Sequence, residues 1–138
     1  MQENKIRTGI QAEIYVAEEL AKRGCWVGNF NKGRTGTQPF DQIMTGKKKV
    51  WAYDVKHSKI DRFDFRRVEE NQESALGFLY QQGVVNTGFV IVYKDTLYYL
   101  SYGTYLTLKK NGDKSVKITE LITFLDLLMY KGEIAYAW

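Results

Sequence analysis

An aspartate and a lysine, Asp54 and Lys56, stand two residues apart in the β-rich segment 49–57 (KVWAYDVKH). Side chains alternate between the two faces of a strand, so both project from the face that carries Val50 and Ala52. A buried charge costs several kcal/mol unless it is paired or bound to a metal. The spacing therefore indicates either an ion pair on a solvated face or part of a site for charged chemistry.

Two further carboxylates belong to the same argument. Asp41 lies in the segment 39–45, which is predicted to form a hairpin with 49–57, and opposed strands bring side chains within about 5 Å. Glu13 falls within the apolar stripe of the first predicted helix. Three inward carboxylates repel one another, and hard oxygen ligands select Mg²⁺, with Mn²⁺ as an alternative. We therefore expect a divalent cation among them.

Periodicity and turn residues predict the elements that position these side chains. A helical stripe containing Ile10, Ile14 and Leu20, together with Ile6, Ala17 and Ala21, precedes Gly24, which ends the first helix. Asp64 is the expected cap of a second helix that Gly83 ends. The predicted elements are helix 4–23, strands 25–30, 39–45 and 49–57, helix 64–82, strands 84–93 and 96–102, and helix 121–130. The order αβββαββα predicts an α/β fold, a mixed β-sheet flanked by helices.

Length and composition predict one domain, residues 1–138, because 138 residues with 44% hydrophobic content can bury a core and no linker composition interrupts them. The lone Cys25 has no partner for an intramolecular disulfide, and we expect it in the core of a cytoplasmic protein. No apolar run is long enough to span a bilayer.

Positive charge is concentrated in residues 32–67, which hold ten Lys or Arg against four Asp and so carry +6, whereas the remainder carries −2. Such a segment favours a polyanionic partner, although a solvated basic face has the same composition. The candidates for phosphate contacts with DNA are Arg34, Lys47, Lys48, Lys49, Arg62, Arg66 and Arg67. The tyrosines at 98, 99, 102 and 105 are expected in the core rather than as base-stacking platforms.

The acids at 41 and 54, the lysine two residues later and a helical glutamate before them resemble the PD-(D/E)xK nuclease superfamily, with PFD (39–41) in place of the name-giving Pro-Asp. Further segments follow in the order found in RecU-type Holliday junction resolvases, over nearly the whole chain. These segments are RTGIQAE (7–13), YDVKHS (53–58), RVEENQ (67–72) and NGDKSVKITEL (111–121).

This resemblance implies a restriction-endonuclease-like core and a Mg²⁺-dependent, structure-selective endodeoxyribonuclease that acts as a homodimer on Holliday junctions in DNA recombination and repair. By position, Asp41 and Asp54 would hold the metal with support from Gln72. Lys56 would stabilise the transition state or orient the attacking water. Glu13 matches the N-terminal helical glutamate of related resolvases.

The sequence departs from the family pattern at three places. Pro39 stands near a position that usually carries Ser or Thr, Asp54 replaces a frequent Glu, and only NKGRTGTQ (31–38) occupies the place of a long basic stalk. The missing stalk bears on junction selectivity more than on hydrolysis. Two alternatives therefore stay open: a less selective restriction-like or nicking nuclease, and a catalytically inactive DNA-binding relative.

Overall fold

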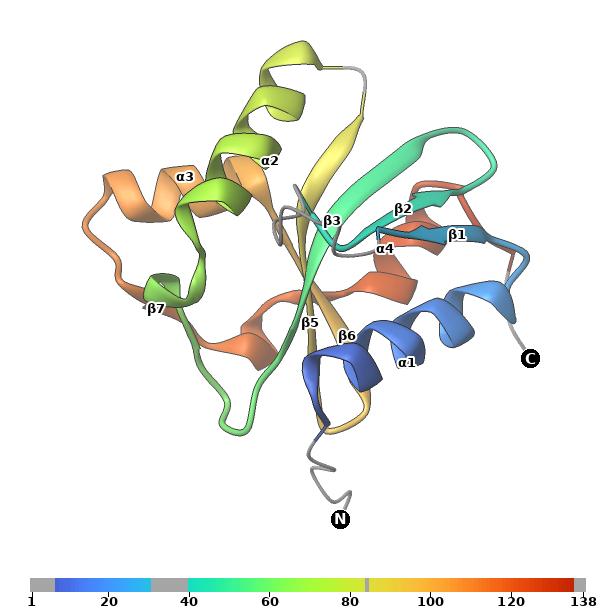
Figure 1. The fold of residues 1–138 in the computed structure, drawn as a ribbon, viewed down its shortest axis with the longest axis horizontal. Helices are drawn as coiled ribbons and strands as arrows, with labels where there is room; N and C mark the ends of the chain where they lie inside the picture. Colours follow the sequence, from blue (N-terminus) through green and yellow to red (C-terminus); the bar gives the residue numbers. More distant parts are fainter. Residues whose placement is uncertain (1–6, 31–39, 84, 136–138) are drawn as a thin grey trace.

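The computed structural model describes residues 7–30, 40–83 and 85–135. Its centre is a six-stranded sheet in the order β1-β2-β3-β5-β6-β8 (Figure 1). The strands β3 and β5 are parallel, and every other neighbouring pair in this sheet is antiparallel. The sheet strands are β1 (Trp26–Asn29), β2 (Gln42–Thr45), β3 (Val50–His57), β5 (Asn86–Tyr93), β6 (Thr96–Ser101) and β8 (Ile122–Thr123).

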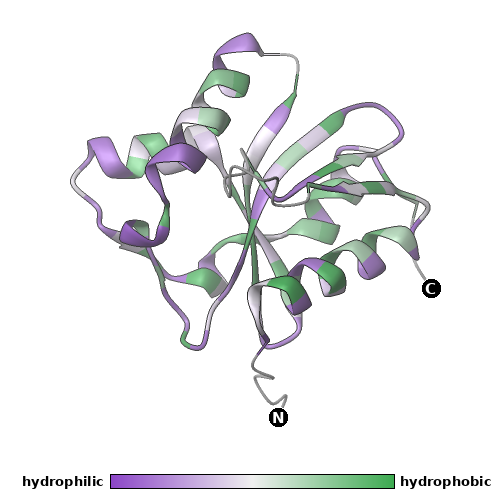
Figure 2. Ribbon diagram, viewed as in Figure 1, coloured by the Kyte–Doolittle hydropathy of each residue, from purple (hydrophilic) through white to green (hydrophobic). Residues whose placement is uncertain are grey.

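Helices cover both faces of this sheet. On one face, α1 and α4 pack against the side chains of Trp51, Tyr53 and Val55. On the other, α2 and α3 pack against Ala52 and Phe89. Apolar residues accordingly line the middle of the sheet in Figure 2. The helices are α1 (Gly9–Ala21), α2 (Glu70–Gln82), α3 (Tyr102–Lys110) and α4 (Phe124–Tyr130), and the remaining elements are β4 (Phe63–Asp64), β7 (Ser115–Val116) and the 3₁₀ turns η1 (Phe65–Arg67) and η2 (Ile118–Glu120). The predicted mixed sheet flanked by helices is confirmed.

The first helix turns a different face to the sheet from the predicted one. Its buried residues are Ala12, Val16 and Leu20, whereas Ile10 and Ile14 are 71% and 51% exposed. Residues 10 and 12 lie about 200° apart around a helix, so the sequence carries two apolar stripes and only one can face the sheet. In the structure the helix begins at Gly9, after a capping box formed by Thr8. The predicted start, residue 4, lies outside the described residues.

Two other helices begin later than predicted, and one was not predicted. Asp64 caps the short turn η1 through the backbone N–H of Arg66, so α2 begins only at Glu70. The helix α4 was predicted to begin at residue 121, but Leu121 ends η2 and the next two residues form β8. The helix therefore begins after Thr123, which caps it. The helix α3 follows β6 directly, with Ser101 as its cap.

Other predictions about single residues are confirmed. Gly83 ends α2 in a left-handed conformation with φ +70°, and Gly24 has φ +84° after α1. The turn between β5 and β6 holds both Lys94 and Asp95 at positive φ, as tight hairpins require. Cys25 is buried, and so are the tyrosines at 99, 102 and 105, with Tyr98 packed beside them. None of the described helices is long and apolar enough to cross a membrane.

Candidate functional site

The hairpin of β2 and β3 brings Asp41 and Asp54 together. Gln42 pairs with Tyr53, and the backbone N–H of Asp41 donates to the Tyr53 carbonyl at 3.1 Å, so the pairing extends one step beyond β2. Both aspartates are buried, with exposed fractions of 6% for Asp41 and 0% for Asp54. The alternation predicted for this hairpin thus places the two carboxylates on the face that α2 covers.

Four side chains form one polar cluster at this point. The Asp41 Oδ2 accepts a hydrogen bond from the Val55 backbone N–H at 2.7 Å. The Asp54 Oδ1 accepts from Gln72 Nε2 at 3.1 Å, and Asp54 Oδ2 lies 3.0 Å from Lys56 Nζ. Lys56 Nζ also donates to Gln72 Oε1 at 3.2 Å. Of the residues predicted for the site, Asp41, Asp54, Lys56 and Gln72 are therefore brought together.

The cap of α2 explains why Gln72 reaches the hairpin. Glu69 and Gln72 form a capping box, in which Gln72 Oε1 accepts from the Glu69 backbone N–H at 3.1 Å. With this oxygen directed at the cap and at Lys56, the amide nitrogen points to Asp54. Gln72 thus orients Asp54, and its oxygen becomes available to a metal only if the amide rotates away from these partners.

Burial and like charge act together on Asp54. Removal from water, followed by the hydrogen bond and the charge of the neighbouring Asp41, raises the pKa of Asp54 to about 8, against the opposing effect of Lys56. The Oδ2 atom of Asp54 is buried and receives no directed hydrogen bond, although Lys56 lies within ion-pair distance. One ammonium therefore leaves the carboxylate pair short of positive charge, which a proton or a cation supplies.

The remaining predicted residue, Glu13, belongs to α1. It is half-buried on α1, the helix that packs on the opposite face of the sheet, and its backbone carbonyl accepts from Gln42 Nε2 at 2.7 Å. Among the described residues no three His, Cys, Asp or Glu side chains gather closely enough to hold a metal. The expected close cluster of three carboxylates is therefore not formed, and a role for Glu13 in the site stays a prediction.

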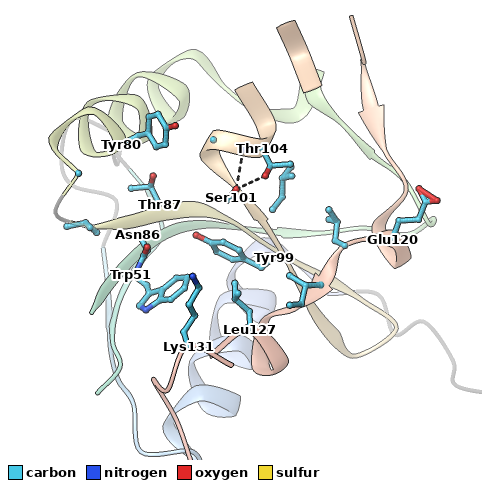
Figure 3. A pocket seen from close by; sticks show the side chains of 16 residues that line it. Trp51, Tyr80, Asn86, Thr87, Tyr99, Ser101, Thr104, Glu120, Leu127 and Lys131 are labelled. Carbon is cyan, nitrogen blue, oxygen red and sulfur yellow. Dashed lines mark hydrogen bonds between the residues drawn. The ribbon is translucent and has the colours of Figure 1, made fainter. Parts of the chain in front are cut away.

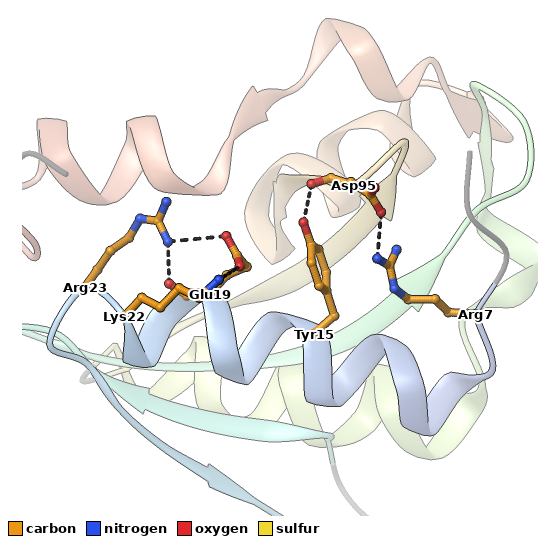
Figure 4. A network of polar contacts seen from close by, with 6 residues as sticks. All are labelled: Arg7, Tyr15, Glu19, Lys22, Arg23 and Asp95. Carbon is orange, nitrogen blue, oxygen red and sulfur yellow. Dashed lines mark hydrogen bonds and ion pairs between the residues drawn. The ribbon is translucent and has the colours of Figure 1, made fainter. Parts of the chain in front are cut away.

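Polar contacts fix α1 on the sheet (Figure 4). Arg7 pairs with Asp95 at 2.6 Å and lies over the ring of Tyr15, 4.0 Å from its centroid. The Tyr15 hydroxyl donates to the Asp95 carbonyl at 2.6 Å. These contacts tie the start of α1 to the β5–β6 turn, while Glu19 pairs with Lys22 near the other end of the helix.

The predicted phosphate contacts fall at two ends of the hairpin. Lys47, Lys48 and Lys49 are exposed at its tip, five residues or about 17 Å along β3 from Asp54. The arginines at 62, 66 and 67 are exposed beyond the other end of β3, and Arg67 donates to the His57 carbonyl at 2.8 Å. Arg66 forms an ion pair with Asp64 at 2.7 Å, and Arg62 donates to Ser115 at 2.8 Å. Arg34 and Pro39 lie outside the described residues.

The donor set fits a hard divalent cation. The two carboxylates and the Gln72 amide offer oxygen ligands, and Asp54 Oδ2, although 3.0 Å from Lys56 Nζ, is buried and accepts no hydrogen bond from the described residues. Mg²⁺ in proteins is commonly bound by one or two carboxylates, with water and substrate phosphate completing its shell. Two buried aspartates are thus enough to hold it, without a third acid.

The solved structures provide the comparison that bears on this site. The Holliday junction resolvase Hjc from Archaeoglobus fulgidus superposes with a TM-score of 0.65 at 13% sequence identity, covering 86% of this chain and 98% of that one. The two chains share a fold. This is a mixed sheet flanked by helices, as the sequence pattern predicts, and it matches the restriction-endonuclease-like core that the resemblance implies. Neither the family models nor the curated proteins include a match to this sequence.

One residue that organises the hairpin was missed by the sequence reasoning. Glu133, only 2% exposed, accepts hydrogen bonds from the backbone N–H groups of Lys48 and Lys49 at 2.7 and 3.1 Å and from the Trp51 indole at 2.8 Å. It thereby fixes the backbone of the lysine-rich tip. The sequence shows Glu133 only as an acid followed by apolar residues. This pattern does not indicate that its side chain binds the backbone of the hairpin tip.

Proposed function

We propose that this chain is a Mg²⁺-dependent endodeoxyribonuclease that hydrolyses phosphodiester bonds at the cluster of Asp41, Asp54 and Lys56. The observation that carries the proposal is the buried pair of carboxylates beside a single ammonium, an arrangement that raises the pKa of Asp54 to about 8. Such a pair destabilises the protein unless the site has a ligand of positive charge. The fold shared with a Holliday junction resolvase supports the same reaction class.

Each residue has a distinct task in this proposal. Asp41 and Asp54 would hold Mg²⁺, or Mn²⁺ in its place, and Gln72 keeps Asp54 oriented. A bound divalent cation supplies positive charge to the phosphate and acidifies water, which is the chemistry that hydrolysis requires. Lys56, with a side chain 13% exposed, holds a fixed positive charge where the phosphate oxygens develop negative charge.

The proposed substrate is branched DNA, with the four-way Holliday junction of recombination and repair as its main form. The similarity to Hjc supports this substrate, and the order of the sequence motifs supports a RecU-type enzyme in particular. Lysines at the hairpin tip and the arginines at 62, 66 and 67 would contact the phosphates. Two related cuts in a two-fold substrate call for a C₂ dimer of the chain.

A cleavage assay tests the proposal. Labelled four-way, flapped and linear duplexes are incubated with the protein in Mg²⁺ and in EDTA, beside the variants Asp54→Asn and Asp113→Asn. Asp113 is an exposed aspartate after α3, so its variant controls for loss of one carboxylate. We expect Mg²⁺-dependent cleavage of the four-way junction that Asp54→Asn lowers at least a hundredfold and Asp113→Asn leaves unchanged. Undiminished cleavage by Asp54→Asn would exclude this site.

The same assay separates the two alternatives. Equal cleavage of all three substrates would identify a less selective restriction-like or nicking nuclease that uses the same residues. Binding of DNA without cleavage, together with no heat of Mg²⁺ binding in calorimetry, would identify an inactive relative. Sedimentation of the protein with and without junction DNA measures the proposed dimer.

A further inference from the structure

A cavity lies away from the carboxylates, where β5 begins and β6 ends (Figure 3). Its volume is about 620 Å³, within the range of small-molecule sites. The ends of α2 and α4 and the start of α3 close around it, and none of Asp41, Asp54, Lys56 or Gln72 lines it. The role proposed for those residues therefore leaves this cavity unexplained.

One wall of the cavity carries a buried hydroxyl without a partner. Thr87 on β5 is 5% exposed, and its Oγ1 makes no hydrogen bond to any part of the chain that the structure describes. A valine has the same shape and would leave no unsatisfied group in a strand. The hydroxyl is accounted for if a ligand in the cavity completes its hydrogen bond.

The first turn of α3 gives the cavity an anion-binding edge. Ser101, Gly103 and Thr104 line it, and Ser101 Oγ accepts from the Thr104 backbone N–H at 3.1 Å. The start of a nine-residue helix concentrates positive partial charge and carries N–H groups that have no carbonyl partner within the helix. The exposed Lys131 also lines the cavity, and Figure 3 shows the acidic Glu120 at the opposite end.

Aromatic side chains line part of the cavity, beside aliphatic residues. Trp51 is held in place by Glu133, and Tyr99 lies edge-on to it with ring centroids 5.5 Å apart. Gly88 makes room for the Tyr99 ring, because a Cβ atom there would lie 2.6 Å from the Tyr99 hydroxyl. Tyr80 adds an exposed ring at the mouth. The cavity thus offers an apolar wall that includes aromatic side chains, a hydrogen-bonding hydroxyl and an edge for an anion.

We propose that this cavity binds a nucleotide, with the base against the aromatic wall and Thr87, and the phosphate at the first turn of α3. The three features match the three parts of that ligand: a flat ring, polar groups on its edge and a phosphate. The nucleotide is either free in solution or a single nucleotide of a DNA strand, since both present the same groups. The proposal does not depend on the nuclease activity proposed above.

Titration of the whole chain with the four deoxynucleoside 5′-monophosphates tests the proposal, followed by amide NMR spectra and tryptophan fluorescence. We expect the amides of Gly103 and Thr104 to shift and the fluorescence of the buried Trp51 to change. The corresponding deoxynucleosides and inorganic phosphate should each bind at least tenfold more weakly, because each satisfies only part of the site. No shift of the α3 amides at millimolar nucleotide would overturn the proposal.

A pair of threonine variants provides the sharper test. Thr87→Val should raise the melting temperature by about 3–6 °C, since it removes an unsatisfied hydroxyl, and weaken nucleotide binding about fivefold, the worth of one neutral hydrogen bond. Thr45→Val, in the strand β2 outside the cavity, should change nucleotide affinity less than twofold. A Thr87→Val protein that is less stable and binds nucleotide as before would contradict the proposal.

A final arm distinguishes the two sources of the nucleotide. A single-stranded oligonucleotide is titrated into the Asp54→Asn protein, which keeps the strand uncut if the nuclease proposal holds. Displacement of the monophosphate by the oligonucleotide, weakened by Thr87→Val, assigns the cavity to DNA. Binding of the monophosphate alone assigns it to a free nucleotide. Both results are independent of cleavage.

Discussion

Replacing Asp54 with Asn is expected to stabilise the metal-free protein at neutral pH, although it removes a polar residue from the interior. Burial first, and then Asp41, raise the pKa of Asp54 from 3.8 to about 8 in the folded protein. A raised pKa means that the folded state binds the proton more tightly than the unfolded state. The stabilisation is therefore complete below about pH 4 and is lost as the pH rises toward 8.

The size of the effect follows from the number of protons bound. Between about pH 5 and 8, Asp54 carries one proton in the folded state and nearly none in the unfolded state, so the free energy of unfolding falls by at most about 1.4 kcal/mol per pH unit. From about pH 5.5 to 7.5 the total is about 3 kcal/mol. Asparagine has no proton to lose, so the stability advantage of Asp54→Asn over the wild type should grow by about 3 kcal/mol between about pH 5.5 and 7.5.

Urea unfolding in EDTA at about pH 5.5, 6.5 and 7.5 measures this difference, with Asp113→Asn as the matched control. His57, the one histidine of the chain, is present in all three proteins and cancels in the comparison. Addition of Mg²⁺ should stabilise the wild type at the highest pH and leave Asp54→Asn unchanged. Parallel pH dependence of the wild type and Asp54→Asn would refute the electrostatic reasoning on which the metal site rests.

Three other predictions concern the scaffold and the DNA surface. Glu133→Gln should lower the free energy of unfolding in urea by about 2 kcal/mol, because the amide has one acceptor oxygen for three donors, including the Trp51 indole; an unchanged midpoint would contradict this role. Tyr15→Phe removes the hydrogen bond to the Asp95 carbonyl and should cost about 1 kcal/mol in thermal unfolding, whereas no change would show that the bond contributes nothing. Replacing the lysines at 47–49 with alanine should reduce the salt dependence of junction binding in fluorescence anisotropy, by up to about 2.7 in the logarithmic slope; an unchanged slope would remove the hairpin tip from the interface.

The centre of the site could be predicted from the sequence because a hairpin has little freedom. Alternation sets Asp54 and Lys56 on one face, and a tight turn closed by the Gly46 N–H to the Lys49 carbonyl fixes the pairing of β2 with β3. This pairing alone places Asp41 opposite Asp54, whatever helices pack on the sheet. The resemblance to known nucleases added Gln72, which lies on a different element.

The parts that could not be predicted depend on choices between equivalent local patterns. Two apolar stripes run along the first helix, and only the packed structure shows that Val16 rather than Ile14 faces the sheet. Tyr102 and Tyr105 fit strand alternation with the tyrosines before them, so α3 was missed although Ser101 is a favourable cap. Tertiary contacts decide such cases, because neither alternative violates a local rule.

The site and the scaffold are joined at Gln72. Its Oε1 serves the capping box of α2 and accepts from Lys56, while its Nε2 donates to Asp54. Formation of the first turn of α2 therefore places the Gln72 amide, a neutral donor, beside the buried carboxylate pair. Since Asp54 and Asp41 repel each other and the adjacent backbone of β3 is held by neighbours on both sides, the acids cannot relax by moving apart. The sheet and the helix cap thus hold the two carboxylates together, and the remaining charge conflict can be relieved only by a proton or a cation.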